Sequence, residues 1–318
     1  MRTQTLAQTQ LDVSTLCYGT MQFGRDMGTA ESDRLMDMYR DAGGNFFDTA
    51  HCYCSWLPSG PGASERVLGD YVKQRGCRDK VVLATKGAHP SMPNYRTVEK
   101  YMSAGRIGAD IDDSLARMQV DTIDLYWLHR DDPRVPVGEI LEILNDEVRR
   151  GRIRYFGGSN WTARRLDEAN VYACEHGIMG FAASQPRWSL ACQDEEPEGE
   201  RRLEPGVLLA LSREDFERHR ASRLSVCPYG PTANGFFATD GKKPDKYRTE
   251  RGQRRLKAAK EVADQVGATP NQVAIAWLLH QPFPVFPILG TGNPDHLADA
   301  LGAVDVSLTD DQVQMLEC

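Results

Sequence analysis

The sequence has no apolar run long enough to cross a membrane, and residues 1–11 lack the apolar core of a signal peptide. It also has no basic excess, because 45 acidic residues outnumber 38 lysines and arginines and give a net charge of −7. This balance argues against nucleic acid or an anionic membrane as the main partner. We therefore expect a cytoplasmic protein that acts on a small molecule, and nothing in the sequence predicts its oligomeric state.

The eight cysteines show no repeated spacing of the kind that binds metal ions. Cys52 and Cys54 lie beside His51, but the single residue between them gives a poor chelate loop, and no second ligand pair follows. We therefore predict no metal site and expect reduced thiols. A response of Cys52 or Cys54 to oxidation stays open, although nothing in the sequence indicates a lowered thiol pKa.

The sequence does contain a regular alternation of short apolar runs with segments that carry apolar residues at helical spacing. This pattern predicts strands at 16–19, 45–47, 81–85, 123–128, 153–156, 181–183, 224–227 and 285–288. It predicts helices between them, including 162–176, 207–220 and 254–266, and a helix whose start is capped by Thr269 and Gln272. Two alternating pieces, 2–6 and 10–14, are expected to pair as a hairpin before the first strand.

Eight strand and helix units in 318 residues are what a (β/α)8 barrel requires. The alternative is an open doubly wound sheet, which normally carries a G-x-G-x-x-G fingerprint after its first strand. The segment Gly19–Gly24 lacks that spacing. We therefore predict one α/β TIM barrel domain spanning residues 1–318, with an N-terminal hairpin and a short C-terminal helix.

Polar residues follow three of the predicted strands directly, where they interrupt apolar runs. Asp48 follows the second strand with Tyr53 five residues later, Lys86 follows the third and His129 follows the fourth. In a barrel these strand ends meet at one opening, where active sites lie. A lysine and an aspartate form an ion pair there, and the ammonium stabilises the phenolate of a neighbouring tyrosine, which makes that tyrosine a usable proton donor and acceptor.

These residues carry a resemblance to a known family. The segment 44–53, together with Ala84-Thr85-Lys86 and Leu128-His129-Arg130, resembles the signature of the aldo-keto reductases, and the resemblance covers essentially the whole chain. It implies an oxidoreductase that interconverts an aldehyde, ketone or keto-sugar and its alcohol. By the resemblance Tyr53 is the general acid and base, Asp48 and Lys86 tune it, and His129 orients the carbonyl or assists proton transfer. A cofactor-binding regulatory subunit and a lyase or isomerase that retains its cofactor stay open.

The same resemblance implies a nicotinamide cofactor site in the second half of the chain. The side chains of Ser159, Asn160 and Gln185 would hold the carboxamide, Tyr229 would stack under the ring, and Thr291 with the helix amides at Asn293 would bind phosphate. The full predicted set is Thr20, Met21, Asp48, Ser159, Asn160, Gln185, Tyr229, Gly230, Pro231, Thr232, Gly290, Thr291, Gly292, Asn293, His296 and Asp299.

One departure from the family pattern concerns the choice of cofactor. Many NADPH-dependent members carry a basic residue where Gly290 or Gly292 stands here, and an arginine where His296 stands. Without those groups the 2'-phosphate loses charge-assisted partners. We expect NADPH, with NADH as the alternative.

Two tryptophans are predicted to contact the substrate together with His129. Trp56 follows the catalytic tyrosine, and Trp188 follows Gln185. Aromatic walls of this kind suit a polyhydroxylated, carbohydrate-like carbonyl compound as well as many others. The acidic segment 193–200 is either a lid or a solvated surface loop, and its composition favours the loop.

Overall fold

The computed structural model of the chain describes residues 1–25, 27–92, 95–97, 99–191, 205–206, 208–242 and 245–317. The acidic segment 193–200 lies outside these residues. Within the described part of the chain, no helix combines the length and the apolar composition needed to cross a bilayer.

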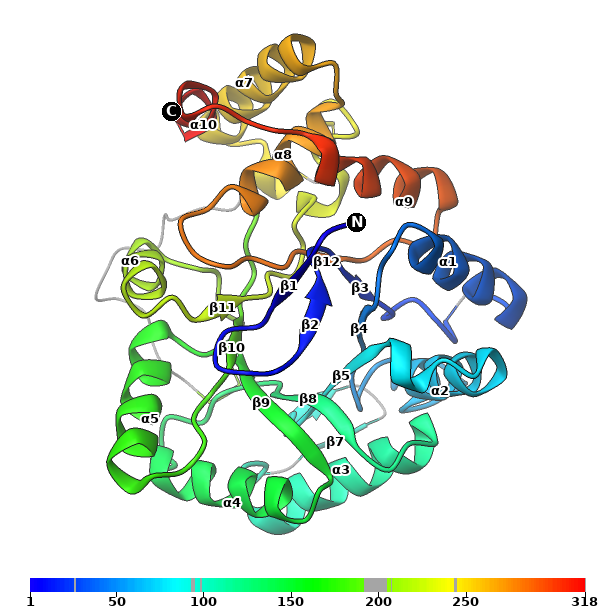
Figure 1. Cartoon of the computed structure of the whole chain (residues 1–318), viewed down its shortest axis with the longest axis vertical. Coiled ribbons are helices and arrows are strands. Elements are labelled where there is room, and N and C mark those ends of the chain that lie inside the picture. Colours follow the sequence, from blue (N-terminus) through cyan, green and yellow to red (C-terminus); the bar gives the residue numbers. More distant parts are fainter. Residues whose placement is uncertain are drawn as a thin grey trace.

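Eight parallel strands curl into a barrel (Figure 1). They are β3 (Cys17–Gly19), β4 (Phe46–Asp48), β5 (Val82–Gly87), β8 (Ile123–Leu128), β9 (Ile153–Ser159), β10 (Ala183–Gln185), β11 (Ser225–Val226) and β12 (Ile288–Leu289). Neighbours in the sheet follow the order of the chain, and β12 pairs with β3. Parallel bridges from Val226 to Val285 and from Tyr229 to Ile288 join the two ends of the sheet. The predicted (β/α)8 barrel is confirmed.

Helices surround the strands (Figure 1), as expected where a parallel sheet must be covered by amphipathic helices. They are α1 (Thr29–Asp41), α2 (Ala63–Arg75), α3 (Ala104–Met118), α4 (Val137–Arg149), α5 (Ala163–His176), α6 (Arg213–Ser222), α7 (Glu250–Val266), α8 (Pro270–Leu279), α9 (Pro294–Leu301) and α10 (Asp310–Glu317). The predicted cap of α8 is present, because Thr269 accepts a hydrogen bond from the Gln272 amide and the Gln272 side chain accepts one in return.

Several predicted boundaries were wrong. The helix predicted at 207–220 is α6, which begins only at Arg213, because Ser212 and Asp215 form a capping box. Residues 208–212 are not helical, and Ala210 instead forms a bridge with Arg187. Helix α7 begins four residues earlier than predicted, where Thr249 caps it. Strand β10 begins at Ala183 rather than at 181.

The predicted N-terminal hairpin is present as β1 (Thr3–Thr5) and β2 (Asp12–Ser14), and it closes the amino end of the barrel. Figure 1 shows it lying across the strands. Leu6, Leu11 and Val13 are buried in the cluster that fills the barrel, which includes Phe46 and Trp127. Since this end is plugged, the carboxyl ends of the strands form the open mouth.

A short second hairpin follows β5 and leads into α3. Its strands are β6 (Ser91–Met92) and β7 (Arg96–Thr97), which pair antiparallel. Tyr95 lies between the two strands and is half-buried. The hairpin therefore stands beside the loops at the barrel mouth.

Substitution of Gly44 by alanine tests how tightly helix α1 packs against the barrel. A Cβ atom at this position would lie 2.3–2.5 Å from three ring atoms of Tyr39. That ring cannot move freely, because it is buried and its hydroxyl donates to the carbonyl oxygens of Leu16 and Phe46. We expect Gly44→Ala to lower the free energy of unfolding by about 1–3 kcal/mol, measured by urea unfolding.

The matched control is Gly105→Ala in α3, where an added Cβ would meet nothing within 4 Å. Alanine is the better helix former, so this variant should be as stable as the parent chain or slightly more stable. Equal stability of the Gly44 and Gly105 variants would contradict the packing argument.

Candidate active site

The four predicted catalytic residues gather at the barrel mouth. Asp48 is the last residue of β4, Lys86 lies inside β5 near its carboxyl end, and His129 directly follows β8. Tyr53 stands in the turn after β4 and is half-buried. The first three are nearly inaccessible to solvent, with 2%, 2% and 7% of their surfaces exposed.

The Lys86 ammonium is the centre of the arrangement. It forms a short ion pair with Asp48 Oδ2 and donates to the Thr49 carbonyl oxygen at 2.7 Å. It also donates to the Tyr53 hydroxyl at 3.1 Å. The second carboxylate oxygen of Asp48 accepts from Gln185 Nε2 at 3.1 Å. Each charge of the pair therefore has buried partners, as a buried ion pair requires.

These contacts shift the pKa values of Lys86 and Tyr53. Burial lowers the pKa of Lys86, but the Asp48 carboxylate and Tyr53 outweigh that effect and the net shift is upward, so the ammonium stays charged. Burial raises the pKa of Tyr53, and the Lys86 ammonium acts against this rise. Lys86 thus makes the phenol more acidic than burial alone would leave it, which is the direction that the sequence predicts.

His129 completes the group as a neutral side chain. Burial lowers its pKa well below the usual value, and the charges of Arg130 and Lys86 act in the same direction together with His89. Its ring stands edge-on to the Tyr53 ring, with 6.0 Å between centroids. A neutral imidazole in this place can donate one hydrogen bond and accept another.

Cys52 lies next to His129, with its Sγ 3.5 Å from His129 Nδ1. Burial raises the pKa of Cys52 to about 12, so this thiol is protonated at neutral pH. Since the thiolate is the form that oxidants attack, this argues against the oxidation response considered for Cys52. Within the described residues no two cysteines form a disulfide.

The residues predicted to hold the nicotinamide lie beside this group at the ends of β9 and β10. Ser159 Oγ donates to the Gln185 carbonyl oxygen, and Asn160 Nδ2 donates to Ser159 Oγ and to the His129 carbonyl oxygen. The Tyr229 hydroxyl donates to Asn160 Oδ1 at 2.8 Å. Hydroxyl and amide groups of this kind suit a carboxamide, which both donates and accepts. A carboxamide would have to take over some of these bonds.

Asn160 has a left-handed backbone with a φ of 60°. Asparagine is one of the few residues that adopt this conformation readily. The turn that it forms directs the chain out of β9 and allows its side chain to reach both His129 and Tyr229. The geometry explains why an asparagine stands at this strand end.

The segment predicted to bind the adenosine phosphate is less open than expected. Asn293 caps α9: its side chain accepts from the amides of Asp295 and His296, and its own amide donates to Thr291 Oγ1. The amides expected to bind phosphate are thus already used by the cap. An anion would have to displace Asn293 to reach them.

Some of the other predicted cofactor residues are exposed or have open space beside them, and others already form hydrogen bonds. Met21 is 42% exposed, and Gly290 has open space where a Cβ would stand. Thr20 is buried and hydrogen-bonded to Ser64, and Asp299 accepts from the side chains of Thr269 and Asn271. The remaining predicted positions are Gly230, Pro231 and Thr232, in the loop after β11, and Gly292, where a Cβ would meet Met27 and Gln22.

The two predicted substrate tryptophans have different environments. Trp56 is half-buried in the loop after Tyr53. Trp188 is 3% exposed and packs in the core against Trp277 and Phe283, with ring centroids at 5.4 and 6.0 Å. The aromatic surface of Trp188 is thus covered by the core, which gives no support to the predicted contact with substrate.

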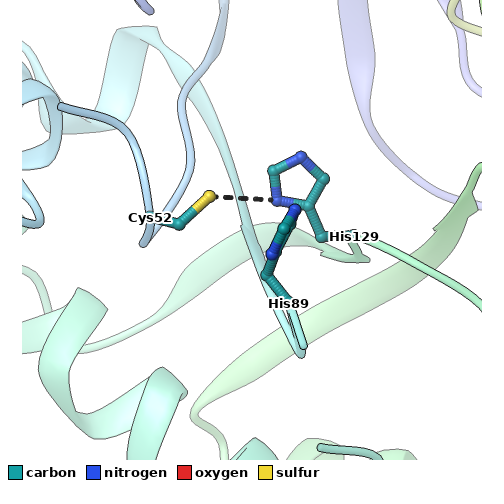
Figure 2. A group of neighbouring side chains, drawn as sticks. All are labelled: Cys52, His89 and His129. Atoms are coloured by element: carbon teal, nitrogen blue, oxygen red, sulfur yellow. Dashed lines mark hydrogen bonds between the residues drawn. The ribbon is translucent and has the colours of Figure 1, made fainter. Parts of the chain in front are cut away.

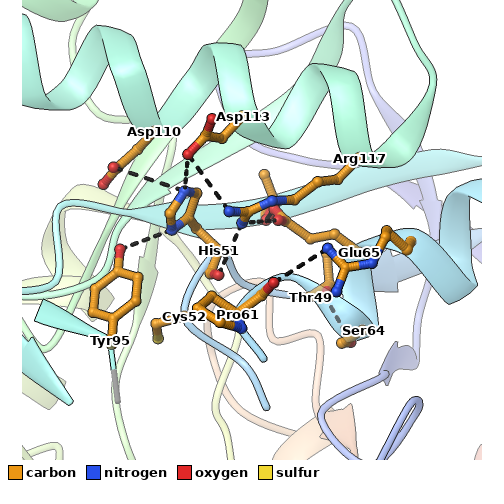
Figure 3. A network of polar contacts seen from close by, with 12 residues as sticks. Thr49, His51, Cys52, Pro61, Ser64, Glu65, Tyr95, Asp110, Asp113 and Arg117 are labelled. Carbon is orange, nitrogen blue, oxygen red and sulfur yellow. Dashed lines mark hydrogen bonds and ion pairs between the residues drawn. The ribbon is translucent and has the colours of Figure 1, made fainter. Parts of the chain in front are cut away.

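A partly buried polar network holds the turn that carries Tyr53 (Figure 3), and sequence reasoning missed it. The His51 ring bonds to the Tyr95 hydroxyl at 2.7 Å and to Asp113 Oδ2 at 2.9 Å. Arg117 donates to the His51 carbonyl oxygen at 3.1 Å and to Glu65 at 3.0 Å. The turn is thus fixed to α2, α3 and the second hairpin, two residues before the predicted acid.

A groove of about 1010 Å³ lies at the opposite end of the barrel, near the amino ends of β8 and β9. Two of its lining arginines, Arg78 and Arg154, form ion pairs with Asp124. Barrel enzymes work at the carboxyl ends of their strands, so we do not assign the active site to this groove.

Comparisons with known proteins agree on one family. Residues 15–318 match the model of the Aldo/keto reductase family. The chain is similar to the uncharacterized oxidoreductase YrpG of Bacillus subtilis strain 168, with 34% identity over 98% of this chain and 93% of that protein. It is similar to norsolorinic acid reductase B of Aspergillus parasiticus, with 32% identity over 96% of this chain and 80% of that protein.

Two further proteins extend the comparison. Aryl-alcohol dehydrogenase [NADP(+)] of Phanerodontia chrysosporium is 29% identical over 96% of this chain and 82% of that protein. The solved structure of the thermostable aldo-keto reductase Tm1743 with the inhibitor epalrestat superposes with a TM-score of 0.75. It covers 100% of this chain and 99% of that one, and at 22% identity it supports the fold alone.

Substitution of Arg117 tests whether the polar network around the turn stabilises the fold. Glu65 is fully buried, and the Arg117 guanidinium is its charged partner. Arg117→Leu leaves that carboxylate without a cation, so we expect the free energy of unfolding to fall by about 3 kcal/mol in urea. The control is Arg75→Leu, which removes an exposed pair with Asp37 and should change stability far less. Equal effects of the two variants would contradict the role given to the network.

Proposed function

The chain belongs to the aldo/keto reductase family, and from this premise we propose that it reduces an aryl aldehyde or aryl ketone with NADPH and catalyses the reverse oxidation of the alcohol. That it is an oxidoreductase follows from the family and from relatives named as oxidoreductases. The aryl substrate is supported by the names of two relatives, a norsolorinic acid reductase and an aryl-alcohol dehydrogenase.

The observation that carries the mechanism is the hydrogen bond from Lys86 to the Tyr53 hydroxyl, with Asp48 behind it. Within the family the bound nicotinamide supplies or takes up the hydride. Tyr53 gives its phenolic proton to the carbonyl oxygen as that oxygen becomes an alcohol. The Lys86 ammonium stabilises the phenolate that remains, and Asp48 keeps Lys86 charged.

His129 orients the carbonyl in this proposal. Its Nδ1 faces Cys52 Sγ, so its other nitrogen is left for the substrate oxygen. Because the imidazole is neutral, it positions the carbonyl by a hydrogen bond and leaves proton transfer to Tyr53. Trp56 stays a candidate wall of the pocket. The carbohydrate-like substrate loses support, because Trp188 lies in the core.

NADPH is the cofactor that we propose, supported by a relative named for NADP(+). Ser159, Asn160 and Gln185 would hold the carboxamide, and Tyr229 would lie against the ring. NADH stays the alternative, because His296 stands where many NADPH-dependent members have an arginine. Cytoplasmic location remains an expectation from composition.

The first experiment is a fluorescence titration of the protein with NADPH and NADH, followed by absorbance assays against aromatic aldehydes, aliphatic ketones and keto-sugars. Binding with carbonyl-dependent oxidation of NADPH, fastest for aromatic substrates, is the expected result. Tight binding without turnover on any carbonyl would overturn the reductase and favour a regulatory or non-redox role. Faster turnover of keto-sugars would overturn the aryl substrate.

Tyr53→Phe tests the proton donor. The variant keeps the ring and removes only the hydroxyl, so cofactor binding should stay nearly unchanged while turnover falls by about 100- to 10,000-fold. The control is Tyr172→Phe in α5, whose ring stacks on His176 far from the barrel mouth. Retained turnover in the Tyr53 variant would remove Tyr53 from the mechanism.

Lys86→Met tests the tuning of Tyr53. Loss of the ammonium disfavours the phenolate, so the pKa of Tyr53 should rise, and the pH profile of alcohol oxidation, which needs the phenolate, should move to higher pH. The measurement is the pH dependence of kcat/KM, with Lys73→Met on the surface as control. If the single variant does not fold, the double variant with Asp48→Asn removes both charges. An unchanged profile would make Lys86 structural.

A further inference from the structure

Three buried side chains with metal-binding atoms meet beside the proposed active site (Figure 2). Cys52 lies in the turn after β4, His89 follows β5, and His129 follows β8. One ligand atom from each lies within 4.8 Å of the other two. All three side chains are buried, with exposures of 1%, 5% and 7%.

The distances suit a tetrahedral zinc ion. Zinc binds sulfur at about 2.3 Å and imidazole nitrogen at about 2.0–2.1 Å, which places two such ligand atoms about 3.5 Å apart. Cys52 Sγ and His129 Nδ1 already stand at 3.5 Å. The rings of His89 and His129 are 4.9 Å apart and nearly perpendicular, so small rotations about their side-chain bonds bring the third ligand into range.

The sulfur and nitrogen atoms of Cys52, His89 and His129 indicate which class of metal ion would bind. Thiolate and imidazole are ligands for zinc and other borderline or soft ions, whereas magnesium and calcium prefer oxygen. Three protein ligands with one open position are also the usual pattern of an accessible zinc site, in which water takes the fourth place.

We propose that Cys52, His89 and His129 form a zinc-binding site and that zinc bound there inhibits carbonyl reduction. The sulfur binds as thiolate, so its proton passes to the buffer as the zinc–sulfur bond forms. No oxidation or reduction takes place. The inhibition rests on the proposed function, because it acts through His129, whereas the binding of zinc does not.

The expected mode of inhibition is displacement. Zinc draws the rings of His129 and His89 toward each other, which moves the His129 ring away from the position in which it orients a carbonyl. It also restrains Cys52, the residue directly before Tyr53. Since a misplacement of about 1 Å can reduce a rate by about 100-fold, we expect saturating zinc to lower turnover by at least about tenfold.

The test begins with zinc binding to the full chain in metal-free buffer, measured by competition with a chromophoric chelator. His89→Ala is the main variant, because His89 is outside the proposed catalytic set. It should bind zinc at least about tenfold more weakly. The control variant Cys174→Ala/His176→Ala removes a cysteine and a histidine exposed on α5 and should keep the site intact.

A second measurement does not depend on activity or on the His89 variant. Cobalt(II) in place of zinc gives a sulfur-to-metal charge-transfer absorption when a thiolate binds it, and Cys52→Ser should abolish this band while Cys54→Ser keeps it. Loss of the band only in the Cys52 variant supports the site. A band that persists in Cys52→Ser overturns it.

The outcomes separate the two proposals. Absence of zinc binding, or equal binding by the parent chain and His89→Ala, overturns the site even if the protein reduces carbonyls well. One bound zinc without loss of turnover overturns the inhibition. A chain that reduces no carbonyl compound overturns the proposed function, and the chelator and cobalt titrations still decide the site.

Discussion

The buried ion pair between Lys86 and Asp48 is the interaction on which the barrel mouth depends. Two charges withdrawn from water are tolerated only if each finds its partners inside the protein. Lys86 meets this condition through Asp48, Thr49 and Tyr53, and Asp48 meets it through Gln185, 137 residues away. The pair therefore joins β4, β5 and β10, so the interaction that stabilises the mouth also positions the proposed acid.

Sequence alone predicted the barrel because its signals are local. Apolar runs with polar residues at their ends identify the strands, and the Thr269 and Gln272 cap identifies a helix start from four residues. The start of α6 was missed for a related reason, because a short apolar run such as 207–211 reads equally well as a helix face. The burial of Trp188 could not be predicted, since three aromatic rings from distant elements cover it.

The sequence predicted those site residues that lie at or just after the ends of strands. It did not predict those whose position depends on contacts between distant elements. The pairs of Arg117 with Glu65 and of His51 with Asp113 join residues 52 and 62 positions apart. The grouping of Cys52 with His129 spans 77 positions, so no ligand spacing could indicate it. At α9 the sequence predicted a phosphate held by the amides at the helix start, and the side chain of Asn293 occupies two of these amides.

Closure of the barrel also has a consequence for biosynthesis. One edge of β3 pairs with β4 and the other pairs with β12, through Cys17 and Ile288, so the second edge of the first barrel strand receives its partner only when the last strand has been made. At ordinary rates of translation this interval is on the order of tens of seconds. The barrel therefore closes only after β12 has been synthesised, because the edge of β3 that receives β12 has no other partner strand in the sheet of the described residues.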